Sequence, residues 1–140
     1  MKQFAMLVAT VAVVAVSPEL RAAQDPCATA KSQLQINECV GAQAHNEEQR
    51  LAEYFAAARR RLSDDKKTLA ALDKAQATWT SFLKEDCDAV YSNWEGGSIR
   101  NAKFSTCMRD GRRARTHDLW AQYLTYEDTT PPILPEPKAL

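Results

Sequence analysis

Apolar residues recur at helical spacing along the first half of the chain. Between Ser32 and Leu62 the apolar positions are three, four or seven residues apart, with Glu and Arg on the other faces: Ile36, Val40, Ala44, Leu51, Phe55, Ala58 and Leu62. This spacing predicts a long amphipathic helix. Ser32 is a suitable N-cap, and Arg59, Arg60 and Arg61 would occupy the last turn, where cations favour the negative end of the helix dipole.

A second helical pattern follows Ser63-Asp64-Asp65. A hydroxyl at the N-cap and carboxylates in the first turn are a typical helix start, because they satisfy free N–H groups and complement the dipole. The helical spacing continues through Leu69, Leu72, Ala75, Trp79, Phe82 or Leu83, Cys87 and Val90. Because the junction with the first helix is so short, we expect the two helices to fold back as an antiparallel hairpin.

The rest of the chain predicts one more helix and an irregular end. Gly96-Gly97 should end the second helix, residues 98–105 should form a connection, and a third helix should run from about Thr106 to Tyr126. No sustained strand alternation occurs. The sequence therefore predicts an all-α fold, a small antiparallel three-helix bundle within residues 24–127. The proline-rich residues 128–140 should be extended or disordered.

The N-terminus is typical of a cleavable secretory signal. Lys2 precedes an apolar run from Ala5 to Val16, and small residues follow at Ala22-Ala23, so we assign residues 1–23 to a signal peptide. The run is too short to span a bilayer, and Cys27 lacks the preceding small-residue stretch of a lipoprotein site. We expect a periplasmic or secreted protein without a membrane span.

Composition and charge exclude some classes of partner. Removing residues 1–23 deletes Lys2, Arg21 and Glu19 and changes the formal net charge from 0 to −1. Such a chain is not a polycation, so we expect no nucleic-acid partner.

The four cysteines predict two disulfides, because their number is even and the destination is oxidising. Their spacing lacks a zinc knuckle. In an up-down-up bundle Cys27, Cys39, Cys87 and Cys107 all fall at one end, and this proximity alone allows three pairings. We favour Cys27–Cys39 with Cys87–Cys107, since each pair closes a local loop without requiring the helices to shift.

Several short blocks, in order, resemble one known family. The most specific block has Leu72-Asp-Lys-Ala-Gln-Ala-Thr-Trp79 followed by Phe82 and Cys87. The others are Cys27 with Ser32-Gln33 and Asn37-Glu38-Cys39, Gly96-Gly97-Ser98, and Cys107, Arg115 and Leu119. With these blocks the chain is similar to the LprI-type lysozyme-inhibitor domain from Cys27 to Leu124. It departs from the family in helix one, where Ala52 and Phe55 replace the usual Asn and Tyr, and at Arg112, where Thr is common.

No pattern predicts catalysis or a cofactor. His45 and His117 have polar neighbours and no Ser or Cys placed to pair with them, so we expect exposed histidines, no catalytic residues, no metal and no cofactor. Gln76 and Trp79 lie one turn apart. We interpret Trp79 as filling the hairpin core and Gln76 as bonding to backbone near the third helix, with a ligand site as the alternative.

Two candidate binding features remain. One is the arginine cluster Arg109, Arg112, Arg113 and Arg115, either a solvated helix face or, together with Arg59 to Arg61, a patch for an anionic partner. The other is the loop from Gly96 to Lys103, in which Gly96, Gly97, Ser98 and Arg100 are the candidate contacts. Its glycines can serve backbone geometry alone, or the loop can enter a partner's cleft.

The family resemblance implies a binding protein and not an enzyme, with lysozyme or another envelope protein as its partner. A lysozyme cleft holds two essential carboxyl groups, so an inhibitor needs hydrogen-bond donors or positive charge on a protruding element. The alternatives are a periplasmic envelope-stress or chaperone-like module that binds apolar or anionic envelope components, and a small enzyme or metal binder.

Overall fold

Three helices make up the fold within the residues that the structure, a computed structural model, describes, which are 27–137. They are α1 (Gln33–Arg61), α2 (Lys66–Asn93) and α3 (Arg100–Tyr123). The predicted all-α class is confirmed. The expected signal peptide and its cleavage site lie outside the described residues. None of the three helices is long and apolar enough to cross a membrane.

The start of α1 is the predicted one, and the start of α2 is two residues later than the Ser63 N-cap that we expected. Ser32 caps α1, because its hydroxyl accepts a hydrogen bond from the Gln35 N–H at 3.2 Å. Asp65 caps α2 and accepts from both the N–H and the hydroxyl of Thr68, at 3.0 and 2.6 Å. These bonds hold the pKa of the Asp65 carboxyl below its usual value.

The predicted start of the third helix is wrong by six residues. Residues 100–105, which we expected in a connection, form the first turns of α3, and the helix ends at Tyr123 rather than Tyr126. Ile99 occupies the N-cap position and makes no side-chain capping bond. The usual sequence signal for a helix start is therefore missing, which explains the error.

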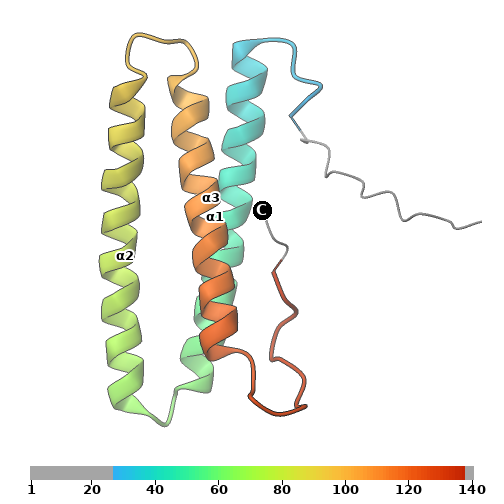
Figure 1. Ribbon diagram of the computed structural model, residues 1–140, viewed down its shortest axis with the longest axis vertical. Helices are drawn as coiled ribbons and strands as arrows, with labels where there is room; N and C mark the ends of the chain where they lie inside the picture. Colours follow the sequence, from blue (N-terminus) through green and yellow to red (C-terminus); the bar gives the residue numbers. More distant parts are fainter. Residues whose placement is uncertain (1–26, 138–140) are drawn as a thin grey trace, which may run out of the picture.

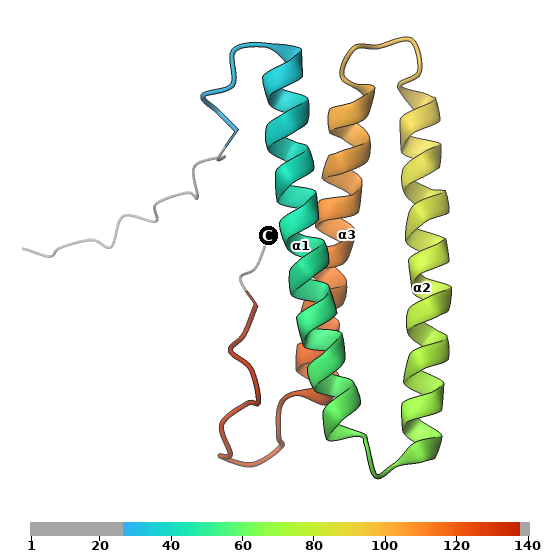
Figure 2. The ribbon, with the colours of Figure 1, turned by 180° about the vertical axis from the view of Figure 1, so that it is seen from behind.

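The helices form a row in which α3 lies between α1 and α2 (Figure 1, Figure 2). α1 and α2 run antiparallel as predicted, but each packs mainly on α3 rather than on the other. Near their junction they are joined by an ion pair, with Arg59 Nε 2.8 Å from Asp73 Oδ1. The main apolar cluster draws on all three helices and on the residue after α3, and comprises Leu51, Tyr54, Ala57, Ala58, Leu72, Leu119 and Leu124.

The segment after α3 is not helical, and residues 125–137 lie back along α1 and α3 as a strap (Figure 1). The indole N–H of Trp120 donates to the Leu134 carbonyl at 3.0 Å, and the Tyr54 hydroxyl donates to the Pro135 carbonyl at 2.7 Å. Leu134 packs against the main apolar cluster. Of the two expectations for the proline-rich end, extended or disordered, residues 128–137 are extended. Their packing on α1 and α3 was not predicted. Burial raises the pKa of Tyr54 above its ordinary value.

Candidate functional site

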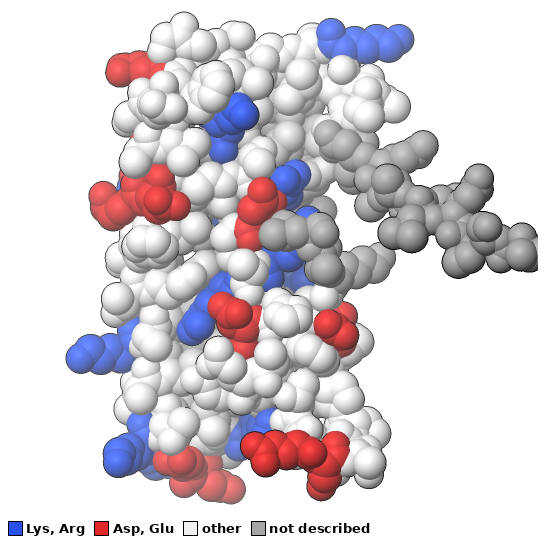
Figure 3. Space-filling view, in the orientation of Figure 1, with Lys and Arg blue, Asp and Glu red and all other residues white. Residues whose placement is uncertain are grey.

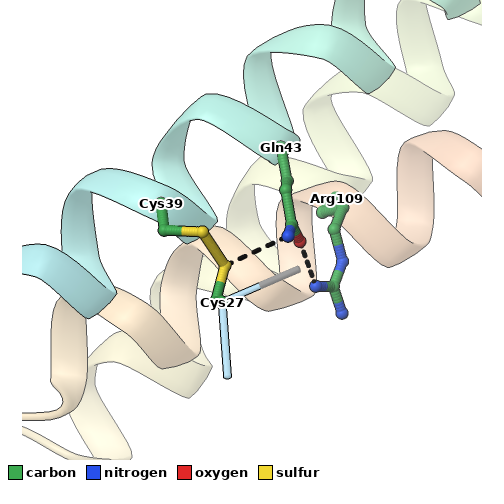
Figure 4. Close-up of a disulfide and its surroundings, with 4 residues drawn as sticks. All are labelled: Cys27, Cys39, Gln43 and Arg109. Atoms are coloured by element: carbon green, nitrogen blue, oxygen red, sulfur yellow. Dashed lines mark hydrogen bonds between the residues drawn. A yellow bond between two sulfur atoms is a disulfide. The ribbon is translucent and has the colours of Figure 1, made fainter. Parts of the chain in front are cut away.

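All four cysteines lie at one end of the bundle, paired as favoured: Cys27 with Cys39, and Cys87 with Cys107. Beside the first disulfide, two consecutive side-chain hydrogen bonds through Gln43 join α1 to α3 (Figure 4). Gln43 Nε2 donates to Cys27 Sγ at 3.1 Å, and Gln43 Oε1 accepts from Arg109 Nη1 at 2.7 Å. The end that carries the α2–α3 connection is therefore cross-linked twice, once between α1 and the segment that precedes it and once between α2 and α3.

The predicted partner-binding loop is divided between a turn and a helix. Gly96 and Ser98 are exposed in the connection, Gly97 is half-buried, and Arg100 begins α3. The connection closes by two backbone bonds, from the Gly97 N–H to the Trp94 carbonyl at 2.9 Å and from the Arg100 N–H to the Gly97 carbonyl at 3.3 Å. We call residues 94–103 the loop pole.

Backbone geometry does not require the two glycines of the loop pole. No glycine among residues 27–137 has a positive φ. A Cβ at Gly96 would meet nothing within 4 Å, and one at Gly97 would make ordinary contacts, the nearest at 3.5 Å. The structure thus removes the geometric explanation for these glycines. Gly96 is exposed and has no side chain to cover its backbone, whereas the Gly97 backbone is hydrogen-bonded within the connection.

Aromatic rings and cations gather beside this loop. The Arg100 guanidinium lies 5.0 Å from the Tyr91 ring centre, and Lys103 Nζ lies 4.8 Å from the Trp94 ring centre. Tyr91 also meets Phe104 edge to face at 6.1 Å. The Trp94 side chain remains 40% exposed and Ile99 37% exposed. These aromatic residues were not among the sequence-based candidates, although Trp94 directly before Glu95-Gly96-Gly97 could have pointed to them.

The arginine cluster on α3 is neither a solvated face nor an open anion-binding patch. Its side chains are half-buried and bonded inside the molecule. Arg113 donates through Nη2 to Glu47 Oε1 at 3.0 Å, and Arg112 donates to the Ala44 carbonyl at 3.0 Å and lies 3.3 Å from Glu48. Together with Arg109 on Gln43, they form a row of polar contacts between α1 and α3.

The arginines at the end of α1 are also largely used internally. Arg59 pairs with Asp73, and Arg61 Nη1 donates to the carbonyls of Tyr123 and Thr125, both at 2.7 Å. Arg61 also lies over the Tyr126 ring at 4.3 Å. These contacts tie the start of the strap to the end of α1.

The four core and family-motif residues lie where α3 packs on the other helices. They are Gln76 and Trp79 of α2 and Arg115 and Leu119 of α3. Arg115 Nε donates to Gln76 Oε1 at 3.0 Å, so Gln76 bonds to a side chain rather than to the backbone group that we expected. Arg115 also lies 5.9 Å from the Trp79 ring centre. Trp79 is half-buried against the main apolar cluster, and Leu119 is fully buried within it.

The histidines lie apart on the surface. His45 neighbours Glu48 at 3.7 Å, and His117 neighbours Glu136 of the strap at 3.5 Å. Asp86, Cys87 and Cys107 have ligand atoms within 4.8 Å of one another, but the two sulfurs are bonded to each other and are not thiolates. This grouping offers one exposed carboxylate, which gives no metal site.

Together, these features define a small, disulfide-linked helical domain in which exposed Trp94 and Ile99 lie beside the half-buried cations Arg100 and Lys103, an arrangement suited to binding. A comparison with protein-family models identifies the family: the model of the lysozyme inhibitor LprI family matches residues 23–119. The match covers more than half of the chain, and the chain belongs to this family, which is described as a lysozyme inhibitor family. Comparisons with curated proteins and with solved structures found no match.

Proposed function

We propose that the protein is exported and inhibits a lysozyme by placing the loop pole in the enzyme's substrate cleft. The observation that carries the proposal is the combination of exposed Trp94 and Ile99 with Arg100 and Lys103 on one cross-linked turn. Family membership supports lysozyme as the target. Two disulfides support an oxidising compartment, the periplasm or the exterior.

The chemistry of the loop pole fits a cleft that holds two carboxyl groups. Cationic groups at Arg100 and Lys103 complement negative charge, and the exposed backbone of Gly96 offers hydrogen bonds to a sugar-binding surface. Trp94 and Ile99 supply apolar area, and an exposed Trp is a frequent anchor of protein interfaces. Because Cys87–Cys107 holds the two flanking helices together, little conformational entropy remains to be lost on binding.

The test measures inhibition of c-type and g-type lysozymes by the oxidised protein, with a reduced and alkylated sample as control. Ser98→Ala combined with Arg100→Ala, and separately Lys103→Glu, should weaken inhibition at least about tenfold. Lys67→Glu at the opposite end of α2 is the matched control and should leave inhibition unchanged. Full inhibition by both loop-pole variants, with unchanged circular dichroism, would refute the site.

A chaperone-like module is the rival, and the same proteins separate it from an inhibitor. Such a module would suppress aggregation of unrelated proteins through apolar surface and would not depend on the charge of Lys103. Suppression of aggregation without inhibition of either lysozyme class would favour the rival over our proposal.

A further inference from the structure

The outer flank of α2 carries an apolar stripe with no partner in the described part of the chain. Ala71, Ala75, Thr78 and Phe82 follow one another by four, three and four residues, so they share one side of the helix. All four are exposed, and the Phe82 ring is 61% exposed. Together with Trp79 and Lys74 they line a shallow apolar depression. We call these residues the α2 stripe.

The row arrangement of the helices explains why this stripe is uncovered. α2 lies at the edge of the row and packs on α3 through its other side, where Leu72, Leu83 and Cys87 are buried (Figure 1, Figure 2). A bundle in which α1 also covered α2 along its length would bury more of this helix. A large exposed aromatic ring beside small residues is typical of an interaction surface.

The distribution of charge along α2 indicates which partner fits the α2 stripe. Near its start lie Lys66, Lys67 and Lys74, and the neighbouring Asp73 is already paired with Arg59. Toward its end lie Glu85 and Asp86, whereas Lys84 and Asp88 pair with each other. In Figure 3 basic side chains project from the lower half of the α2 edge and acidic ones from its upper half.

We propose that the α2 stripe binds the α2 stripe of a second copy of this chain, with the two helices antiparallel. Antiparallel pairing places the basic half of each helix against the acidic half of the other, whereas parallel pairing would place like charges together. A two-fold axis near Thr78 and Trp79 puts Phe82 of each copy over Ala75 and Thr78 of the other. The same axis puts Lys74 opposite Glu85.

The pattern is self-complementary, which is the requirement for a two-fold symmetric interface. Ala71 and Ala75 let a second helix approach closely, and Phe82 supplies the bulky group that fills the space above them. The dimer would leave the loop pole free, because Phe82 precedes Trp94 by 12 residues, about 18 Å along a helix. Dimerisation is therefore independent of lysozyme inhibition, and each can fail without the other.

The experiment is sedimentation equilibrium of the oxidised protein over a concentration series. The unaltered chain should show a monomer–dimer equilibrium, and Phe82→Glu should raise the dimer dissociation constant at least about tenfold. Because Phe82 is 61% exposed, this change should leave the fold and the melting temperature intact. Leu34→Glu, at an apolar position of α1 that is 67% exposed, is the matched control and should leave the dimer unchanged.

Charge reversal tests the antiparallel register. Lys74→Glu alone and Glu85→Lys alone should each weaken the dimer, since each places like charges opposite one another. The double variant Lys74→Glu/Glu85→Lys should restore it. A chain that stays monomeric up to about 1 mM, a concentration that detects even weak association, would overturn the proposal. A dimer that Phe82→Glu does not weaken would also overturn it, as would a double variant that does not restore the dimer. If the protein is monomeric and Phe82→Glu abolishes lysozyme inhibition, the stripe belongs to the lysozyme contact instead.

Discussion

The two sides of α3 are held by different interactions. Toward α1 it meets an extensive apolar cluster, a row of arginine contacts and, at its end, the strap. Toward α2 the contact is narrower: Gly111 of α3 lies against Leu83, Arg115 bonds to Gln76, and Cys87 bonds to Cys107. α1 has seven buried residues and α2 has three, although the two helices are almost equally long.

This difference divides the molecule into a well-packed pair and a third helix that depends on fewer contacts. α1 and α3 resemble a domain core, because apolar burial and satisfied polar groups coincide along their interface. α2 buries little of its surface, so a covalent bond contributes a large share of what holds it in place. The candidate binding surfaces, the loop pole and the α2 stripe, both involve α2.

Removing a disulfide should have the largest effect on stability. In the chain-entropy model each disulfide contributes about 3 kcal/mol, so Cys87→Ser/Cys107→Ser and Cys27→Ser/Cys39→Ser should lower the free energy of unfolding similarly. Their local effects should differ. Without Cys87–Cys107, hydrogen exchange of α2 amides should become faster relative to α1, because α2 has few other contacts.

The Cys27→Ser/Cys39→Ser protein is the control for that measurement, since its lost bond lies at the start of α1. Equal exchange protection of α1 and α2 in both variants would contradict the division of the molecule into a packed pair and a less supported helix.

The sequence was sufficient to predict the class of fold, both disulfides and the bounds of α1. The apolar spacing of α1 is regular because one side of it faces the core, and Ser32 supplies a recognisable cap. For α3 both signals are weak. It lies between two helices, so polar residues such as Arg113 and Arg115 make inter-helix contacts on faces that an amphipathic pattern would leave to solvent.

The tertiary partners of polar residues could not be predicted. Charge clustering at Arg109, Arg112 and Arg113 is the same whether these side chains face solvent or carboxylates on α1, and only the rotation of α3 decides between them. The strap was equally hidden, because proline excludes a helix but does not say where an extended chain docks. Residues 96–103 of the loop pole were found from their glycines and charges, whereas the ring contacts of Tyr91 on α2 and Phe104 on α3 required the fold.

Glu47 tests the polar interface between α1 and α3. Its side chain is 5% exposed, and it accepts from Arg50 Nη1 at 3.0 Å and from Arg113 Nη2 at 3.0 Å. Glu47→Gln should lower the free energy of unfolding by about 2 kcal/mol, less than for a fully buried pair because both arginines are partly exposed. Urea unfolding measures this. Glu53→Gln, at an exposed position of α1, should change stability by less than about 0.5 kcal/mol; an equal loss in the two variants would mean that the Glu47 contacts contribute nothing.

Two helical glycines give the smallest and most direct test of the comparison. A methyl group at Gly111 would overlap Leu83 Cδ1, and Leu83 is only 6% exposed, so it has little room to move away. A methyl group at Gly41 in α1 would meet nothing within 4 Å. Alanine gains about 1 kcal/mol over glycine inside a helix, whereas overpacking a core costs about 1–3 kcal/mol. Gly41→Ala should therefore raise the melting temperature, and Gly111→Ala should lower the free energy of unfolding by about 1 kcal/mol, the difference of these two terms. If both changes stabilised the protein, α2 would not be packed tightly on α3 at this point, and its attachment would depend on the disulfide still more.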